Sequence, residues 1–431
     1  MNSVNTQVLK NVTWHYIYRF IKLGLAFFIT AWFARYLGAE KYGAYVYAVA
    51  LAEMIMLFWS QGLKEVVVHE IKKEGLEKGE VSNAAFQMML MGNVVLYGIL
   101  GGILFLFIGE QVLVILSLLC GLGILFRSFE GYELWFHARL RIKITVWIQL
   151  ISQIIYMTAN IIFILSEADL VWFGVAYAGQ LMLVGSGFAM VYAIEKGRIA
   201  FFGNYRRIQQ KLFESGKYMM LAKLTLTSSF LVDRFIIEYL ITMEAVGYFS
   251  AAMKMTTTLT FIASSIALSF IPILSAAVSD LERNQIIKDM FGWITSSALF
   301  LMIPFYLFAD SLVFLVFGEG YQNSVPIFKI LVLSLPFILL NEGVKSCLVT
   351  SNKTKYYILA MAFTTITAIV VNLLLIPLFS LVGAALAFVI SWISGTIFTF
   401  LFFKETRFLG KQILASFLYP IILVLKHLSS R

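Results

Sequence analysis

Long apolar stretches recur along the whole chain and constrain its fold more than any other feature. A stretch of about 20 apolar residues is long enough to cross a bilayer as a helix. Of the residues, 60% are hydrophobic and 13% are charged, whereas soluble domains carry about a quarter charged residues. The sequence therefore predicts an all-α integral membrane protein. The first stretch, from near Trp14, is long enough to span and is expected to remain in the mature chain.

We expect about twelve transmembrane helices, each close to the length of one span. Their ranges are 13–34, 43–63, 83–108, 111–133, 146–166, 170–194, 217–241, 245–278, 291–316, 324–350, 355–378 and 381–403. The tail at 413–425 is shorter and contains Pro420. It is expected to lie at the membrane interface, and a further span there remains an alternative.

Basic residues predict the orientation of these helices. The loops after the even-numbered helices of this series carry most of them, including Lys72, Arg139, Lys196, Arg206 and Lys353. The loops after the odd-numbered helices carry only Arg35 and Lys41. Basic loops stay in the cytoplasm, so both termini are expected there. The net charge of +9 is thus explained by topology, and no nucleic-acid partner is expected.

A repeat divides the chain. "RYLGAEKYGAY" (35–45) recurs loosely as "EYLITMEAVGYF" (238–249), about 203 positions later. We therefore expect two lobes of six helices, related by a pseudo-twofold axis along the membrane normal. The N-terminal lobe with its basic linker covers 1–205, and the C-terminal lobe with the interfacial tail covers 206–431.

Charged residues interrupt the predicted spans. In "FLVDRFIIEYL" (230–240), Asp233, Arg234 and Glu238 stand in an apolar run. Each such charge costs about 2.5–3.5 kcal/mol at a membrane helix centre. These side chains must therefore face protein or water, which makes them functional candidates. One helical face would carry Lys223, Thr227, Arg234 and Glu238.

Other spans carry similar groups. The first holds Arg19 and Lys22 beside Tyr16, the eighth holds Lys254 in a Thr-rich run, and the second holds Glu53. Arg127, Glu130 and Glu133 lie toward the cytoplasmic end of the fourth span and are expected at the interface. Several alternatives remain open: Arg19 and Lys22 could snorkel to the interface, Arg234 and Glu238 could form a structural pair, and Glu53 could be a protonated core acid.

Motifs for chemistry are absent from the sequence. It has no phosphate-binding loop, dinucleotide fingerprint or zinc helix signature. Cys120 and Cys347 show no metal or redox spacing and are expected to be small core residues. No catalytic residue, metal or bound cofactor is therefore expected, and the chain is not expected to be an enzyme.

Several motifs resemble those of one family. They are "SQGLKEVVVHEI" (60–71), "VGYFSAAMKM" (246–255), "FGEGYQNSVPIFKIL" (317–331) and "VNLLLIPLFSLVGAALA" (371–387). Together they resemble the polysaccharide transporter family, the O-antigen and capsule repeat-unit flippases of the multidrug/oligosaccharidyl-lipid/polysaccharide exporter superfamily. The resemblance implies twelve helices in two six-helix lobes forming a V, in the bacterial inner membrane.

The resemblance also implies a substrate. This is an oligosaccharide on polyprenyl (undecaprenyl) diphosphate, moved from the cytoplasmic to the periplasmic leaflet by alternating access. The implied diphosphate ligands are Arg19, Lys22, Lys223, Arg234 and Lys254, and the implied sugar contacts are Tyr16, Thr227, Thr257, Thr258 and Asn372. A proton or sodium gradient would be coupled through Glu53, Asp233 and Glu238. Membrane lipid and other glycan-assembly membrane proteins are the implied partners.

Two alternatives to a flippase remain. A drug/cation antiporter of the same superfamily would share the fold, but the five candidate bases outnumber the three candidate acids, which favours an anionic headgroup. A membrane polymerase or ligase of the same pathway would want a long periplasmic loop, and none of the predicted loops is long. The O-antigen and capsule pathways are not distinguished by these residues.

Overall fold

The computed structural model describes residues 2–74, 79–196, 199, 203–277, 279–351 and 353–420; along 2–23 it describes the backbone but not the side chains. All regular elements in these ranges are helical, which confirms the all-α class. They are α1 (Asn2–Glu74), α2 (Glu80–Phe107), α3 (Gln111–Phe126), η1 (Arg127–Phe129), α4 (Glu130–Ala138), α5 (Ile142–Leu165), α6 (Leu170–Lys196), α7 (Arg206–Leu240), α8 (Met243–Thr258), α9 (Thr260–Ala276), α10 (Asp280–Leu307), α11 (Ala309–Phe317), η2 (Glu319–Tyr321), α12 (Ser324–Val332), α13 (Leu335–Thr350), α14 (Thr354–Ile393), η3 (Ser394–Phe398), α15 (Thr399–Phe402) and α16 (Arg407–Ser416).

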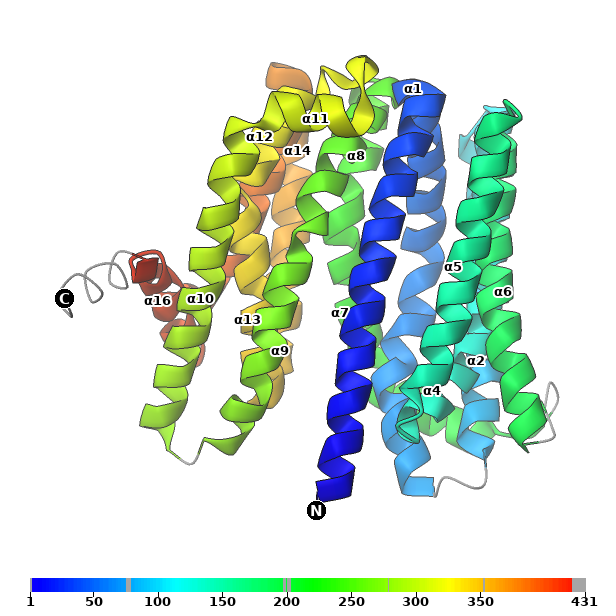
Figure 1. The fold of residues 1–431 in the computed structure, drawn as a ribbon, viewed down its shortest axis with the longest axis vertical. Helices are drawn as coiled ribbons and strands as arrows, with labels where there is room; N and C mark the ends of the chain where they lie inside the picture. The colour runs from blue at the N-terminus through cyan, green and yellow to red at the C-terminus, as the bar shows by residue number, and fades with distance from the viewer. Residues whose placement is uncertain are drawn as a thin grey trace. The chain divides into compact units, whose positions relative to one another are not determined.

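Helix α1 reverses its direction at Gly38. This glycine has φ 72°, a value that residues with a Cβ rarely adopt. The rings of Phe33 and Tyr45 lie 4.7 Å apart, although a straight helix would place these positions about 18 Å apart. Figure 1 shows the dark-blue leg running from the N-terminus and the lighter blue leg returning beside it. The two legs match the predicted spans 13–34 and 43–63.

Helix α14 reverses in the same way at Ser380, which has φ 52° and ψ −135°. Beyond the reversal, Gly383 packs so closely that a Cβ there would collide with the carbonyl of Leu375. These two positions would be about 12 Å apart in a straight helix. The chain therefore folds back. Its first leg matches the predicted span 355–378, and the predicted span 381–403 covers the second leg together with η3 and α15.

Other predicted spans are broken or bent rather than continuous. The span 111–133 is formed by α3, η1 and α4, and α12 and α13 meet at a bend of 45°. Within the described residues, seven helices are long and apolar enough to cross a membrane, or up to nine if each bent pair is one span. Charged residues such as Lys223, Asp233 and Arg234 interrupt the apolar run of α7, which is not in that count. The number of twelve spans and the V remain predictions.

The described chain divides into two compact units. Unit 1 holds α1 up to Leu37 together with Ala44–Thr227, and unit 2 holds Gly38–Gly43 together with the chain from Ser228 onward. The division between the two falls inside α7. The predicted lobe boundary at 205/206 remains a prediction.

The core of unit 1 contains a cluster of aromatic rings at one end of α2, α4 and α6. Tyr132 is fully buried, and its ring lies 4.4 Å from that of Tyr192 and 5.2 Å from that of Phe86. Trp135 packs edge-on against Tyr192. Farther along the unit, Cys120 is buried among aliphatic side chains, as predicted. Burial of these large rings gives unit 1 a core of its own.

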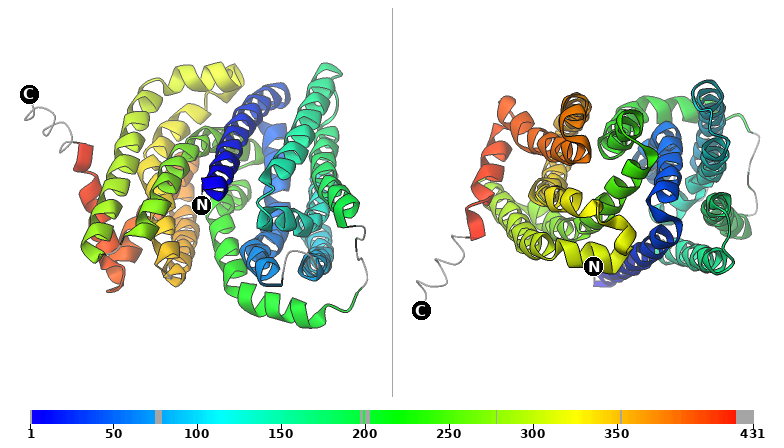
Figure 2. Two further views of the ribbon diagram at one scale, coloured as in Figure 1. Left: turned by 60° about the horizontal axis from the view of Figure 1, so that its bottom comes forward. Right: turned by 90° about the horizontal axis from the view of Figure 1, so that it is seen from above.

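Unit 2 has a separate core. Its α8 packs against α12, and α9 and α10 pack against α13. Trp392 is fully buried beside Phe388 and Phe230, and Cys347 is also buried, as predicted. In the tail, α16 lies along α10 (Figure 2), where the hydroxyls of Thr295 and Ser416 are 2.7 Å apart. Residues 421–425 of the expected interfacial segment lie outside the described residues.

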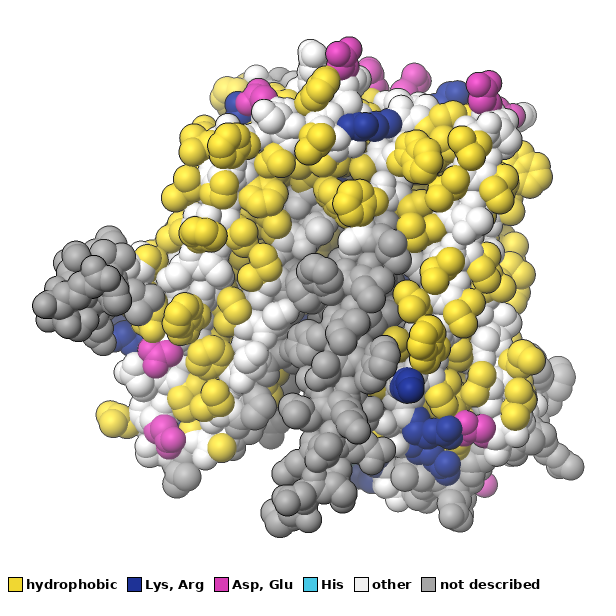
Figure 3. Space-filling view, viewed as in Figure 1, with side chains coloured by type: hydrophobic (Ala, Val, Ile, Leu, Met, Phe, Trp, Pro, Cys, Tyr) yellow, Lys and Arg dark blue, Asp and Glu magenta, His cyan; other side chains and the backbone are white. Residues whose placement is uncertain are grey.

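The outer surface carries many exposed large apolar side chains. Phe105 of α2 is 88% exposed, Phe300 of α10 is 77% exposed and Phe402 of α15 is 78% exposed. On the face shown in Figure 3, apolar side chains occupy the middle and charged ones gather toward the two ends. Such a surface is stable against lipid acyl chains and not against water. The protein is a multi-pass membrane protein.

Candidate substrate site

The buried acid Asp233 anchors the candidate site in unit 2. It lies on the part of α7 that belongs to this unit and is fully buried. Asn372 of α14, also fully buried, donates its Nδ2–H to Asp233 Oδ1 at 2.6 Å and to the carbonyl of Ala368 at 2.8 Å. Asn372 therefore holds the carboxyl group in place from a neighbouring helix.

Two acceptor atoms of this pair are unsatisfied. Asp233 Oδ2 and Asn372 Oδ1 are buried and have no hydrogen-bond partner among the described residues. A buried acceptor without a donor costs about 1–3 kcal/mol. A proton on the carboxyl group or a small cation beside it would offset this cost. The pair thus has the chemistry of a site for a proton or a cation.

Arg234 lies beside Asp233 and points to another helix. Its Nε donates to Ser250 Oγ of α8 at 3.2 Å, and one terminal nitrogen donates to the carbonyl of Phe230 at 2.8 Å. Lys254 stands one helical turn after Ser250, so these two residues share a face of α8. Both bases are half-buried. The structure therefore brings Arg234 of α7 and Lys254 of α8 to the boundary between these helices at Ser250, which we call the seam of α7 and α8.

The predicted threonine contacts follow Lys254 on α8. Thr257 donates its hydroxyl to the carbonyl of Met253 at 2.9 Å, and Thr258 donates to the carbonyl of Lys254 at 2.7 Å. Both side chains are half-buried. A hydroxyl bonded in this way to its own helix keeps lone pairs that can accept a hydrogen bond from a sugar hydroxyl.

The remaining predicted residues are placed as follows. Glu238 is half-buried in unit 2, whereas Lys223 and Thr227 are half-buried on the part of α7 in unit 1. Glu53, also in unit 1, accepts a hydrogen bond of 3.4 Å from the hydroxyl of Tyr177. The side chains of Tyr16, Arg19 and Lys22 lie outside the described residues. The cationic cavity expected between the two halves remains a prediction.

A buried ion network in unit 1 adds to the sequence expectation. Glu130 and Glu133, whose position at the membrane interface stays a prediction, are only 5% and 4% exposed. Glu130 pairs with Lys64 at 2.8 Å and with Arg127 at 2.6 Å, and Glu133 accepts from Gln149 at 2.7 Å. The spacing of three between Arg127, Glu130 and Glu133 places them on one helical face. This spacing is the sequence signal from which the network could have been predicted. Each buried charge has partners of opposite charge, as burial requires.

The fold is similar to those of solved transporters. The lipid II flippase MurJ in an inward closed conformation matches with a TM-score of 0.76 at 15% sequence identity, over 97% of this chain and 93% of that chain. An inward-facing multidrug resistance MATE family transporter of the MOP superfamily matches with a TM-score of 0.69 at 14% identity, over 91% and 95% of the two chains. At these identities the likeness concerns the fold alone.

Sequence comparison gives the family. The probable low-salt glycan biosynthesis flippase Agl15 of Haloferax volcanii is 22% identical over 392 residues, which cover 87% of this chain and 79% of that protein. The family model described as polysaccharide biosynthesis protein matches residues 8–278, more than half of the chain. The family resemblance carried by the sequence motifs is thereby confirmed. The chain belongs to the polysaccharide biosynthesis protein family.

Proposed function

We propose that this protein is a flippase for a lipid-linked oligosaccharide. Its cargo is an oligosaccharide repeat unit on polyprenyl (undecaprenyl) diphosphate, and it moves this cargo from the cytoplasmic to the periplasmic leaflet of the bacterial inner membrane by alternating access. The family, the flippase named among its relatives and the multi-pass helical fold support the proposal. The relative named as a flippase comes from Haloferax volcanii.

The observation that carries the proposal is the placement of Arg234 and Lys254 on one seam inside unit 2. A diphosphate group carries several negative charges and many acceptor oxygens, so it needs cationic donors when it leaves water. An arginine offers two parallel donors and a lysine offers a compact charge. Arg234 donates to Ser250 and Lys254 stands one helical turn after Ser250, so the two bases can bind one diphosphate while the lipid tail stays in the bilayer.

We assign ion coupling to Asp233 and Asn372. Their two unsatisfied acceptors support binding of a proton or a sodium ion at this point. Asp233 adjoins Arg234 in sequence, so a change in its charge acts directly on the guanidinium that would hold the diphosphate. Because Asn372 is fully buried and bonded to Asp233, we place it in the coupling pair and not among the sugar contacts. Glu53 and Glu238 are the secondary coupling candidates.

The test of the proposed function is complementation of a strain that lacks its own flippase for the same glycan. Arg234→Ala and Lys254→Ala should abolish surface glycan, and Arg234→Lys should restore part of it because a positive charge remains. Lys288→Ala removes an exposed base of α10 and serves as the matched control.

The result that would reject the cationic assignment is normal surface glycan in both alanine variants at normal expression. A drug/cation antiporter would give another outcome: the wild-type chain would not restore glycan and would instead lower the accumulation of cationic dyes. Reporter fusions at Lys72 and Arg206 check the proposed orientation, in which both termini are cytoplasmic. A periplasmic signal at either position would reverse it.

A further inference from the structure

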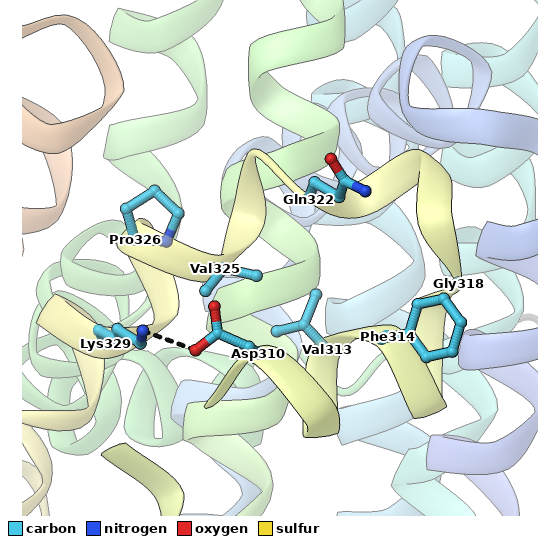
Figure 4. Close-up of a pocket in the computed structure, with 8 residues that line it drawn as sticks. All are labelled: Asp310, Val313, Phe314, Gly318, Gln322, Val325, Pro326 and Lys329. Carbon is cyan, nitrogen blue, oxygen red and sulfur yellow. Dashed lines mark ion pairs between the residues drawn. The ribbon is translucent and has the colours of Figure 1, made fainter. Parts of the chain in front are cut away.

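A pocket of about 510 Å³ lies between α11 and α12, and none of its lining residues belongs to α7 or α8. All of its lining residues belong to unit 2. They are Asp310, Val313, Phe314, Gly318, Gln322, Val325, Pro326 and Lys329. Figure 4 shows Lys329 reaching from α12 toward Asp310 of α11, with Phe314 farther along α11 and Gln322 at the turn between the helices. The proposed diphosphate and coupling sites use none of these side chains.

The local sequence builds a rigid frame for this pocket. Helix α11 ends at Phe317, and the φ of 84° at the next residue, Gly318, allows the sharp turn into η2. Tyr321 of that turn is 1% exposed and packs its ring 5.3 Å from the ring of Phe317. Ser324, at the start of α12, donates to the carbonyl of Tyr248 at 2.9 Å. The two walls are therefore held by the core and do not depend on a ligand.

An ion pair stands at one end of the pocket. Lys329 Nζ lies 2.6 Å from Asp310 Oδ2, and their side chains are 33% and 68% exposed. The hydrogen bond from Lys329 holds the pKa of Asp310 below its usual range, so the carboxylate is ionised at neutral pH. Both groups reach solvent and keep capacity for further hydrogen bonds, the carboxylate as an acceptor and the ammonium as a donor.

The other polar and aromatic groups complete a mixed surface. Gln322 is exposed and adds an amide that can both donate and accept. Phe314 is 55% exposed and lines the same pocket. The pocket thus combines acceptors, donors and one aromatic face within a volume that suits a small ligand.

Charge and polarity narrow the ligand class. A phosphate would meet the carboxylate of Asp310, and a cation would meet the ammonium of Lys329, so the pair favours a ligand without net charge. A purely apolar ligand would desolvate the ion pair without replacing its bonds to water. A pyranose ring carries hydroxyls that donate and accept, and it has an apolar C–H face that can stack on an aromatic ring. It is the ligand class that matches every wall of the pocket.

We propose that the pocket between α11 and α12 binds one pyranose residue of the glycan, and this rests on the proposed function, in which the cargo carries an oligosaccharide. Asp310 and Lys329 bond its hydroxyls, Gln322 bonds a further hydroxyl, and Phe314 stacks against its C–H face. Under the proposed orientation, the turn between α11 and α12 faces the periplasm. The pocket then holds sugar on the side where the glycan is released.

The test measures binding of free oligosaccharide to the full-length protein in nanodiscs. The probe is the oligosaccharide released by mild acid from the lipid-linked glycan of the cells that encode the chain. Phe314→Leu should weaken binding by about 2- to 10-fold, the range expected for loss of one aromatic contact. Gln322→Ala should weaken it as well. Phe308→Leu is the matched control, because Phe308 is 60% exposed and does not line the pocket.

Two results would overturn the proposal: no saturable binding to the wild-type protein, or equal affinity of the Phe314→Leu, Gln322→Ala and Phe308→Leu proteins. Transport of the lipid-linked oligosaccharide, measured in proteoliposomes from the same preparations, separates this outcome from failure of the proposed function. Normal transport, with binding that is unchanged by Phe314→Leu and Gln322→Ala, would reject the sugar pocket and support the flippase function. Binding that depends on Phe314, without transport, would reject the flippase function and support the sugar pocket.

Discussion

Gly43 and Gly247 make reciprocal backbone contacts. Gly43 packs against the carbonyl of Met243, and Gly247 packs against the carbonyl of Ala39, so closely that a Cβ at either glycine would collide with that oxygen. After one inserted residue, the sequence repeat aligns Glu40 with Glu244 and Gly43 with Gly247, and the same offset of 204 positions (247 − 43 and 243 − 39) aligns Ala39 with Met243. A contact in which equivalent positions exchange partners is typical of twofold symmetry. The turn of α1 and the start of α8 therefore meet as two copies of one motif.

This contact predicts that Gly247→Ala destabilises the protein. The added methyl group would meet the Ala39 carbonyl, which is backbone and cannot move aside without shifting the turn of α1. We expect a loss of about 1–3 kcal/mol in unfolding free energy, typical of overpacking. Thermal unfolding in detergent measures it. Gly98→Ala on α2, where a Cβ meets nothing within 4 Å, is the control and should be neutral or stabilising. Equal melting temperatures for the two variants would contradict the close contact.

The Asp233 and Asn372 pair predicts how transport responds to ion gradients. In the proposed coupling role, Asp233 binds a proton or sodium ion, so after Asp233→Asn transport in proteoliposomes should no longer rise when a proton or sodium gradient is applied. Asn372→Ala removes the donor to Asp233 Oδ1, and we expect a loss of about 1–3 kcal/mol in stability. Glu282→Gln, at an exposed position of α10, is the control. Gradient-driven transport that survives Asp233→Asn would remove Asp233 from the coupling site.

The buried ion network of unit 1 predicts a strong effect of a single charge. Lys64→Met leaves Glu130 with Arg127 alone and removes the cation 3.6 Å from Glu133. Loss of one partner from a buried ion pair typically costs about 3–5 kcal/mol. We therefore expect a clear drop in melting temperature and in the yield of folded protein. Lys72→Met, which removes an exposed lysine of the same helix, should have little effect. Similar yields of both variants would mean that the network adds little stability.

The ion pair in the α11 and α12 pocket predicts the pH dependence of oligosaccharide binding. Lys329 lowers the pKa of Asp310 in the folded protein, so the carboxylate form is favoured there. The contribution of the ion pair to binding is therefore fully present above the ordinary aspartate pKa of about 3.9. It is lost as the pH falls through the lower pKa that Asp310 has in the folded protein. Binding should stay constant between about pH 7 and about pH 5 and decline only in stronger acid. Titration of binding across this range checks it, and a decline centred near pH 6 would point to a different group.

The helices could be predicted from the sequence because burial in lipid imposes long apolar runs of defined length. The two reversals also left local signals: Gly38 falls between the predicted spans 13–34 and 43–63, and Ser380 falls between 355–378 and 381–403. The breaks inside spans, such as the one between α12 and α13, were not predictable, since the segments on both sides of the bend are apolar and helical.

The candidate residues could be predicted more readily than their partners. Asp233 and Arg234 stand out because charges in an apolar run are costly. The bond from Asn372 to Asp233 joins positions 139 apart, and that from Arg234 to Ser250 joins two different helices. Such pairings depend on how helices pack, which the periodicity of one helix does not specify. The burial of Glu130 was missed for the same reason, because its partner Lys64 lies on the returning leg of α1.

The two hydrogen bonds of Arg234 have a consequence for any anion that reaches the seam of α7 and α8. A long side chain that is free in solution loses up to about 2 kcal/mol of rotamer entropy when a ligand immobilises it. Ser250 and the Phe230 carbonyl already hold this guanidinium in one orientation, so most of that loss is incurred during folding. An arriving phosphate group then meets a preorganised donor, and its affinity gains from an ordering step completed before it arrives.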